Sequence, residues 1–149
     1  MGDIATNRRA FHFYEITSKV EAGMILVGTE VKSLRSGRAT IEHGYAHARD
    51  GRLTLLGVDI PAYEFAGPHR NHEPGRTRTL LVHKRQMREL ETHASAKGNT
   101  LIPLRIYFHN GFAKVELGLA RGRRAPDRRA AIRKRETERD IRRAMERRR

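Results

Sequence analysis

Leu104–Leu119 reads LRIYFHNGFAKVELGL, the clearest secondary-structure signal in the chain. Apolar and polar residues alternate on both sides of Asn110-Gly111, a dipeptide that accepts the positive φ angles of a two-residue β-turn. The side chains that would share one face are Leu104, Ile106 and Phe108 before the turn and Ala113, Val115, Leu117 and Leu119 after it. The stretch therefore predicts a β-hairpin with one buried face.

Other segments predict further short strands. Residues 10–16 are rich in aromatic side chains, and residues 24–27 form a short apolar run, both of which favour strands. Residues 45–60 predict a second hairpin that turns at Asp50-Gly51. Residues 66–78 are polar and interrupted by Gly and Pro, so we expect a loop there.

Two short helices are expected among these strands. The first begins at Gly28-Thr29, where Thr29 can cap free N–H groups, and ends at Gly37. The second runs from about Lys84 to Ala96, where apolar residues recur at helical spacing. Several strands with few helices indicate a mainly β fold. We predict a small antiparallel β-barrel with short flanking helices, because a closed barrel removes exposed strand edges.

The charge distribution divides the chain into two parts. Its 149 residues carry 31 Lys and Arg against 17 Asp and Glu, for a formal net charge of +14. Residues 121–149 alone hold 14 Lys and Arg against 5 Asp and Glu. We therefore predict one folded body, 1–122, and a basic tail, 123–149. An excess of this size indicates a polyanionic partner.

The tail contains few large apolar side chains: Ile132, Ile141 and Met145. Its apolar edge is too small to dock firmly on the body, and like charges repel along it. We expect the tail to be disordered in the free protein and helical on a phosphate-lined surface, where that repulsion is neutralised.

Composition also excludes several classes of protein. The chain has no cysteine, so disulfides and thiolate metal sites are impossible. It shows no secretory signal and no apolar run near the roughly 20 residues that cross a bilayer. A cytoplasmic protein that does not bind membranes is expected.

Four ordered stretches carry a resemblance to a known family. They are Asn7–Tyr14 (NRRAFHFY), Glu21–Arg35 with its GTEVKSLR block, Asn71–Arg85 with RTRTLLVHKR, and Lys97–Gly122. In these residues the chain resembles the small protein B family, the partners of transfer-messenger RNA. The GTEVKSLR block is the most specific of the four, because composition alone would not produce it.

The resemblance implies a barrel of oligonucleotide-binding type that grips the tRNA-like part of transfer-messenger RNA. It also implies a monomer without enzymatic activity or cofactor. Together with elongation factor Tu, the complex would reach stalled ribosomes. There the tail would enter the decoding centre and the empty messenger channel of the small subunit, against its ribosomal RNA. Translation would then resume on the reading frame of the RNA and tag the unfinished protein.

The resemblance, together with local charge, also implies the RNA-binding residues. They are Asn7, Arg8, Glu30, Lys32, Arg35, Arg76, Arg78, Leu81, His83, Lys84 and Arg85. Glu30 would accept hydrogen bonds from RNA, or orient Lys32 or Arg35, or only complement a helix dipole. Leu81 would pack on a base or sugar, or belong to the core.

The tail positions implied for the decoding centre are Arg123, Arg124, Asp127, Arg128, Arg129, Ile141 and Met145. Asp127-Arg128-Arg129 matches an Asp-Lys-Arg block of the family. Pro126 departs from the family, which usually has His or Tyr there to stack on a base. The guanidinium of Arg124 could partly replace that stacking.

Two histidine pairs have ligand-like spacing, His69 with His72 and His43 with His47. Neither pair lies on a predicted helix that would bring both rings together, so no metal site is expected. The acidic residues are scattered singly, which argues against a hydrolytic nuclease. A generic basic RNA-binding module, of the kind found among ribosomal proteins, remains the alternative to the family assignment.

Overall fold

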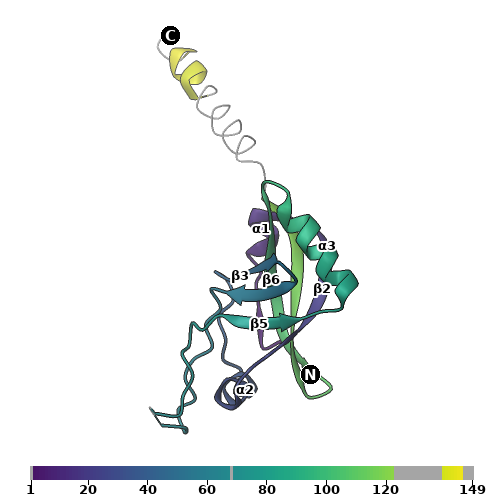
Figure 1. Cartoon of the computed structure of the whole chain (residues 1–149). Helices are drawn as coiled ribbons and strands as arrows, with labels where there is room; N and C mark the ends of the chain where they lie inside the picture. Colours follow the sequence, from purple (N-terminus) through teal and green to yellow (C-terminus); the bar gives the residue numbers. More distant parts are fainter. Residues whose placement is uncertain (1, 68, 123–138, 146–149) are drawn as a thin grey trace.

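The computed structural model describes residues 2–67, 69–122 and 139–145 (Figure 1). The strands are β1 Ala5–Thr6, β2 Tyr14–Met24, β3 Tyr45–Arg49, β4 Arg52–Leu56, β5 Arg78–Leu81, β6 Asn99–His109 and β7 Phe112–Gly122. The named helices are α1 Ala10–Phe13, α2 Gly28–Arg35 and α3 Lys84–Ser95.

The described strands form one antiparallel sheet that closes into a barrel. Their order is β1-β6-β3-β4-β5-β2-β7, and an additional pairing of β6 with β7 joins the two sides. β7 therefore pairs with β2 on one side and with β6 on the other. The mainly β class and the small antiparallel barrel of oligonucleotide-binding type, with short flanking helices, are confirmed.

Both hairpin turns predicted from the sequence are present. Asn110 and Gly111 have φ angles of 50° and 81°, and Asp50 and Gly51 have φ angles of 53° and 75°. Two consecutive positive φ angles define the turn whose twist matches that of paired strands. Local turn chemistry thus sets the register of β6 with β7 and of β3 with β4.

The barrel interior holds the main hydrophobic core. Alternate residues of each long strand point inward, and Leu34 of α2 and Leu90 of α3 add fully buried side chains. The buried strand residues of this core include Val20, Ala22, Ala46, Leu53, Leu55, Leu80, Leu101, Ile106, Ala113, Val115, Leu117 and Leu119. Gly37 has a φ of 80° just beyond α2, as predicted for the end of this helix.

The strand predicted over residues 10–16 is wrong in its first half. Ala10–Phe13 forms the single helical turn α1, and β2 begins only at Tyr14. Burial of Ala10 in a small second core with Ile102, Leu104 and Ala120 explains the difference. A helical turn buries the small Ala10 and leaves the aromatic rings beside it partly exposed.

Two further local predictions are also wrong, and one strand was not predicted. Residues 25–27 leave the sheet after Met24, because the chain turns there into α2. Val27, not Thr29, is the cap residue of this helix. Arg78–Leu81 forms the unexpected strand β5, which completes the barrel by pairing with β4 and β2.

β7 ends at Gly122, the last residue of the predicted body. Residues 123–138 and 146–149 lie outside the described residues, so the division at 122 stays a prediction, as does the free conformation of the tail. Residues 139–145 are helical. Within the described ranges, no helix combines the length and the apolar character required to span a bilayer.

Candidate nucleic-acid interface

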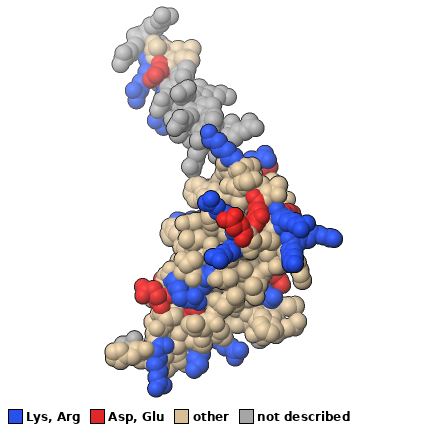
Figure 2. Space-filling model, viewed as in Figure 1, with Lys and Arg blue, Asp and Glu red and all other residues tan. Residues whose placement is uncertain are grey.

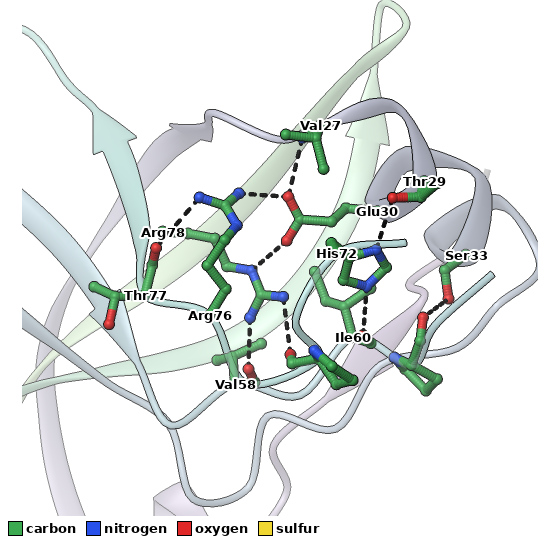
Figure 3. Close-up of polar contacts among 12 residues, drawn as sticks. Val27, Thr29, Glu30, Ser33, Val58, Ile60, His72, Arg76, Thr77 and Arg78 are labelled. Carbon is green, nitrogen blue, oxygen red and sulfur yellow. Dashed lines mark hydrogen bonds and ion pairs between the residues drawn. The ribbon is translucent and has the colours of Figure 1, made fainter. Parts of the chain in front are cut away.

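A buried carboxylate lies where α2, β5 and the arm meet; the arm is the segment 57–77 between β4 and β5. Glu30, in the first turn of α2, is fully buried. Its Oε1 accepts the backbone N–H of Val27 at 2.9 Å and a guanidinium N–H of Arg76. Its Oε2 accepts the Nε–H of Arg78 at 2.7 Å (Figure 3). Both carboxylate oxygens are therefore occupied by protein donors.

Arg78 joins the two ends of the arm. This side chain is fully buried, and it donates from Nη1 to the carbonyl of Val58 at 2.6 Å and from Nη2 to the carbonyl of Pro74 at 2.9 Å. Burial by itself would raise the pKa of Glu30, but hydrogen bonds from Arg76, from the backbone and from Arg78 outweigh it and lower that pKa. The Glu30–Arg78 pair is thus ionised, and it holds the two ends of the arm together.

This arrangement bears on two predictions. Neither the Glu30 nor the Arg78 side chain reaches the surface, which argues against direct RNA contacts by them, and those contacts stay predictions. Glu30 does orient arginines, but these are Arg76 and Arg78, which come from the arm and β5, and not Lys32 or Arg35. Sequence separation concealed the pairing, since the partners lie more than 40 residues apart.

Further hydrogen bonds hold the arm against α2. The Nε2–H of His72 donates to the carbonyl of Ile60 at 2.7 Å, and a carbonyl can only accept. Nδ1 of His72 and the hydroxyl of Thr29 are hydrogen-bonded at 2.8 Å. Ser33 adds a hydrogen bond to the carbonyl of Pro61 at 2.7 Å. Both ring nitrogens of His72 thus serve the fold.

Asn7 braces α1 against β6. Only 3% of Asn7 is exposed, and its Nδ2 donates to the carbonyl of Pro103 at 3.1 Å. Its backbone N–H donates to Leu104, and its carbonyl accepts from Ala10. These bonds give Asn7 a role in positioning the neighbouring turn, and a direct RNA contact by its amide stays a prediction.

Several predicted cations are exposed. Lys32 and Arg35 project from α2, with Nζ of Lys32 5.6 Å from the ring centroid of Tyr63 and the guanidinium of Arg35 5.7 Å from that of Phe108. Arg8 is also exposed. Figure 2 shows Lys and Arg side chains at the lower end of the molecule, where α2 and the arm lie. These positions allow the predicted phosphate contacts, which stay predictions.

A second group of predicted residues gathers at one end of β2. Leu81 is 59% exposed, so it does not belong to the core, and Phe112 is 70% exposed. Both line a hollow of about 460 Å³. We call the following lining residues the Leu81 surface: Glu21, Leu81, His83, Phe112 and Lys114. Exposed apolar side chains beside cations are suited to the bases and phosphates of RNA.

The sequence reading missed Glu21 and Phe112, although alternation could have found both. Val20 and Ala22 face the core, so Glu21 between them must face outward. Ala113 is buried, so its neighbour Phe112 is exposed. The Glu21 carboxylate accepts a hydrogen bond from the hydroxyl of Tyr107, which fixes its position on the surface.

The first turn of α3 carries an unfavourable charge pattern. Lys84 and Arg85 are both exposed there, and this turn contains no acidic residue. Cations at the positive end of a helix dipole cost stability, typically about 0.3–1 kcal/mol each. A polyanion bound at this end would reverse the sign of that interaction. The pattern therefore indicates an anionic ligand beside the Leu81 surface.

The predicted tail residues divide into two groups. Ile141 and Met145 lie in the helical residues 139–145, and both side chains are exposed. The others lie outside the described residues: Arg123, Arg124, Asp127, Arg128 and Arg129.

A closed antiparallel barrel with cationic and apolar surface sites defines a nucleic-acid-binding barrel protein. The model of the family described as SmpB protein matches residues 4–147. The chain belongs to this family.

Individual relatives agree with this assignment. An SsrA-binding protein of Rhodospirillum rubrum is 52% identical over 140 residues, which are 93% of this chain and 88% of the relative. An SsrA-binding protein of Gloeothece citriformis is 45% identical over 144 residues, which are 97% of this chain and 93% of the relative. A solved structure described as "tmRNA-SmpB: a journey to the center of the bacterial ribosome" is similar with a TM-score of 0.68 and 49% identity. It covers 81% of this chain and 85% of its own.

Glu30→Gln is expected to lower the free energy of unfolding by about 3 kcal/mol or more, because it leaves the buried Arg78 charge without its counter-ion. Urea denaturation of the full chain measures this. Glu64→Gln, at an exposed position in the arm, serves as the control and should change little. If Glu30→Gln lowered the free energy of unfolding by less than about 1 kcal/mol, the stabilising role of the Glu30–Arg78 pair would be contradicted.

The same pair predicts a pH dependence. The pKa of Glu30 is lower in the folded chain than its ordinary value of 4.5, so the unfolded chain binds the proton first as the pH falls. The stabilisation is complete above that ordinary value and is lost as the pH falls through the folded pKa. The stability gap between the native chain and Glu30→Gln should therefore narrow between about pH 5 and about pH 3. A constant gap in thermal melts across this range would show that Glu30 does not titrate in this way.

Proposed function

We propose that this protein binds the tRNA-like part of transfer-messenger RNA and accompanies it to stalled ribosomes for trans-translation. The Leu81 surface, on a chain of the SmpB family, carries the proposal. Relatives at about half identity are SsrA-binding proteins, and the similar solved structure is of tmRNA with SmpB on the ribosome. These names support the same ligand for this chain.

The Leu81 surface offers each type of contact that a folded RNA needs. Leu81 and Phe112 present apolar area on which a base or sugar can pack. Lys114 and the cations at the start of α3 face phosphates. Glu21 supplies an acceptor for base N–H or 2′-OH groups, the role that the sequence suggested for Glu30. A fixed hydrogen-bond acceptor among cations favours a folded RNA, which can place a donor beside it, over other polyanions.

The remainder of the proposal concerns the ribosome. The basic tail would contact small-subunit ribosomal RNA in the decoding centre and the empty messenger channel. Delivery would involve elongation factor Tu, and the protein would act in the cytoplasm as a monomer, without catalysis or cofactor. Its +14 charge supports association with RNA at both steps.

Replacing Lys84 and Arg85 together by Gln is expected to weaken binding to the tRNA-like RNA while leaving stability equal or higher. Each lost phosphate contact removes about 0.9 from the slope of log affinity against log salt, so the slope should fall by about 2. Filter binding over a range of salt concentrations measures the slope. Thermal melting of the free protein measures the change in stability.

The matched control replaces Arg49 and Arg52, two exposed cations of the β3–β4 hairpin, by Gln as well. If both double variants reduced the slope equally, binding would depend on net charge and not on the cations at the start of α3 beside the Leu81 surface.

Deletion of all residues after Gly122 is expected to preserve affinity for the isolated tRNA-like RNA but to abolish tagging on stalled ribosomes. The barrel core closes without the tail, whereas the tail carries more than half of the net positive charge. Binding and tagging are measured on the same preparations. Deletion of Arg147–Arg149 alone controls for a small loss of charge. If the long deletion lost affinity for the tRNA-like RNA, the assignment of RNA binding to the barrel and of tagging to the tail would be refuted.

A further inference from the structure

A cavity of about 550 Å³ opens at the other end of the barrel from the Leu81 surface. Three aromatic rings from different elements line it: Phe13 of α1, Tyr14 at the start of β2 and Tyr45 at the start of β3. Tyr45 is 45% exposed. Pockets for small planar ligands have volumes in this range. Aromatic residues that line one space are suited to stacking with another flat ring.

Polar groups surround these rings. Arg9 and His43, both exposed, line the cavity and can donate hydrogen bonds, while Glu42 and Thr100 add acceptors. Proteins recognise an unpaired nucleobase by stacking it on aromatic or guanidinium planes and by hydrogen-bonding its edges. The lining therefore fits a nucleobase better than an aliphatic ligand.

The cavity wall beside Tyr45 is rigid. A Cβ atom added to Gly44 would lie 2.7 Å from Cγ2 of Val58 and 2.9 Å from Cγ of Pro103. The backbone before Tyr45 is thus packed as closely as only Gly allows. Antiparallel pairing of Tyr45 with Leu56 fixes the strand that follows. The tyrosine is therefore preorganised, which lowers the entropy lost on binding.

Strand register places this cavity at the root of the tail. Tyr14 pairs with Gly122, the last residue of β7, whereas Gly23 at the far end of β2 pairs with Lys114 and Leu81. Gly23 lies nine positions after Tyr14 along β2, which corresponds to roughly 30 Å of strand. An RNA bound on the Leu81 surface would leave the cavity open. The cavity therefore lies close to Gly122, the residue that precedes the tail.

We infer that this cavity binds an unpaired nucleobase of ribosomal RNA, with Tyr45 as the stacking residue and Arg9 at the edge of the base. The inference rests on the proposed function, because the ribosome is the partner assigned to the tail. It adds to that function a base-binding site on the folded barrel, distinct from the tail itself.

Tyr45→Leu in the full chain tests the stacking, with Tyr45→Phe as the variant that keeps the ring. Each variant is bound to the tRNA-like RNA, and the complex is titrated with vacant small ribosomal subunits. Loss of one stacked base should weaken subunit binding about 5- to 150-fold for Tyr45→Leu. Tyr45→Phe should stay within about twofold of the native chain, and neither variant should change affinity for the tRNA-like RNA.

Phe65→Leu, at an exposed aromatic position in the arm, is the matched control and should bind subunits normally. Arg9→Gln provides a second test that does not depend on the folding of Tyr45→Leu, and it should also weaken subunit binding. Normal subunit binding by both Tyr45→Leu and Arg9→Gln would overturn the inference. So would equal losses in Tyr45→Leu and Tyr45→Phe, or a loss of affinity for the tRNA-like RNA. If the native chain failed to bind the tRNA-like RNA, the proposed function itself would fail.

A photoreactive phenylalanine in place of Tyr45 identifies the occupant. Cross-linking within the complex on the ribosome should label a nucleotide of small-subunit ribosomal RNA. A cross-link to the tRNA-like RNA, to a ribosomal protein or to the tail of the same chain would overturn the assignment.

Discussion

The pairing of β7 along both β2 and β6 is the constraint on which the arrangement of this protein depends. It closes the barrel and buries the alternate side chains of three long strands in one core. The two ends of β7 then lie far apart, one beside the Leu81 surface and one at the root of the tail (Figure 1). A short rigid barrel can thereby present two surfaces at a fixed separation, which suits a protein proposed to contact one RNA while its tail contacts another.

Electrostatics divides the charged residues between structure and binding. The Glu30–Arg78 pair is buried and neutralises itself, so it holds the arm and α2 but attracts no partner. By contrast, Lys84 and Arg85 lie exposed at the helix end that disfavours cations. Residues that lower the stability of the free protein at a surface are best explained by a ligand. The total charge alone does not distinguish these two uses.

Much of the fold could be predicted from local signals. Alternation with Asn110-Gly111 identified the β6–β7 hairpin, Asp50-Gly51 identified the β3–β4 hairpin, and helical spacing located α3 to within one residue. These elements are set by turn geometry and by the period of apolar residues, both of which act over a few residues. For the site, the sequence indicated the exposed positions Leu81, Lys84 and Arg85. It did not indicate Glu21 or Phe112, which border the same hollow.

By itself, then, the sequence determined the barrel class, the basic character of the chain and its family resemblance, since these depend on composition, period and motif order. Only the tertiary structure decided which charged residues are usable. Glu30, Arg78 and Asn7 read as surface residues, yet closure of the barrel and of the arm buries them beside partners distant in sequence. Burial depends on what the rest of the chain places against a residue, and no local pattern records this.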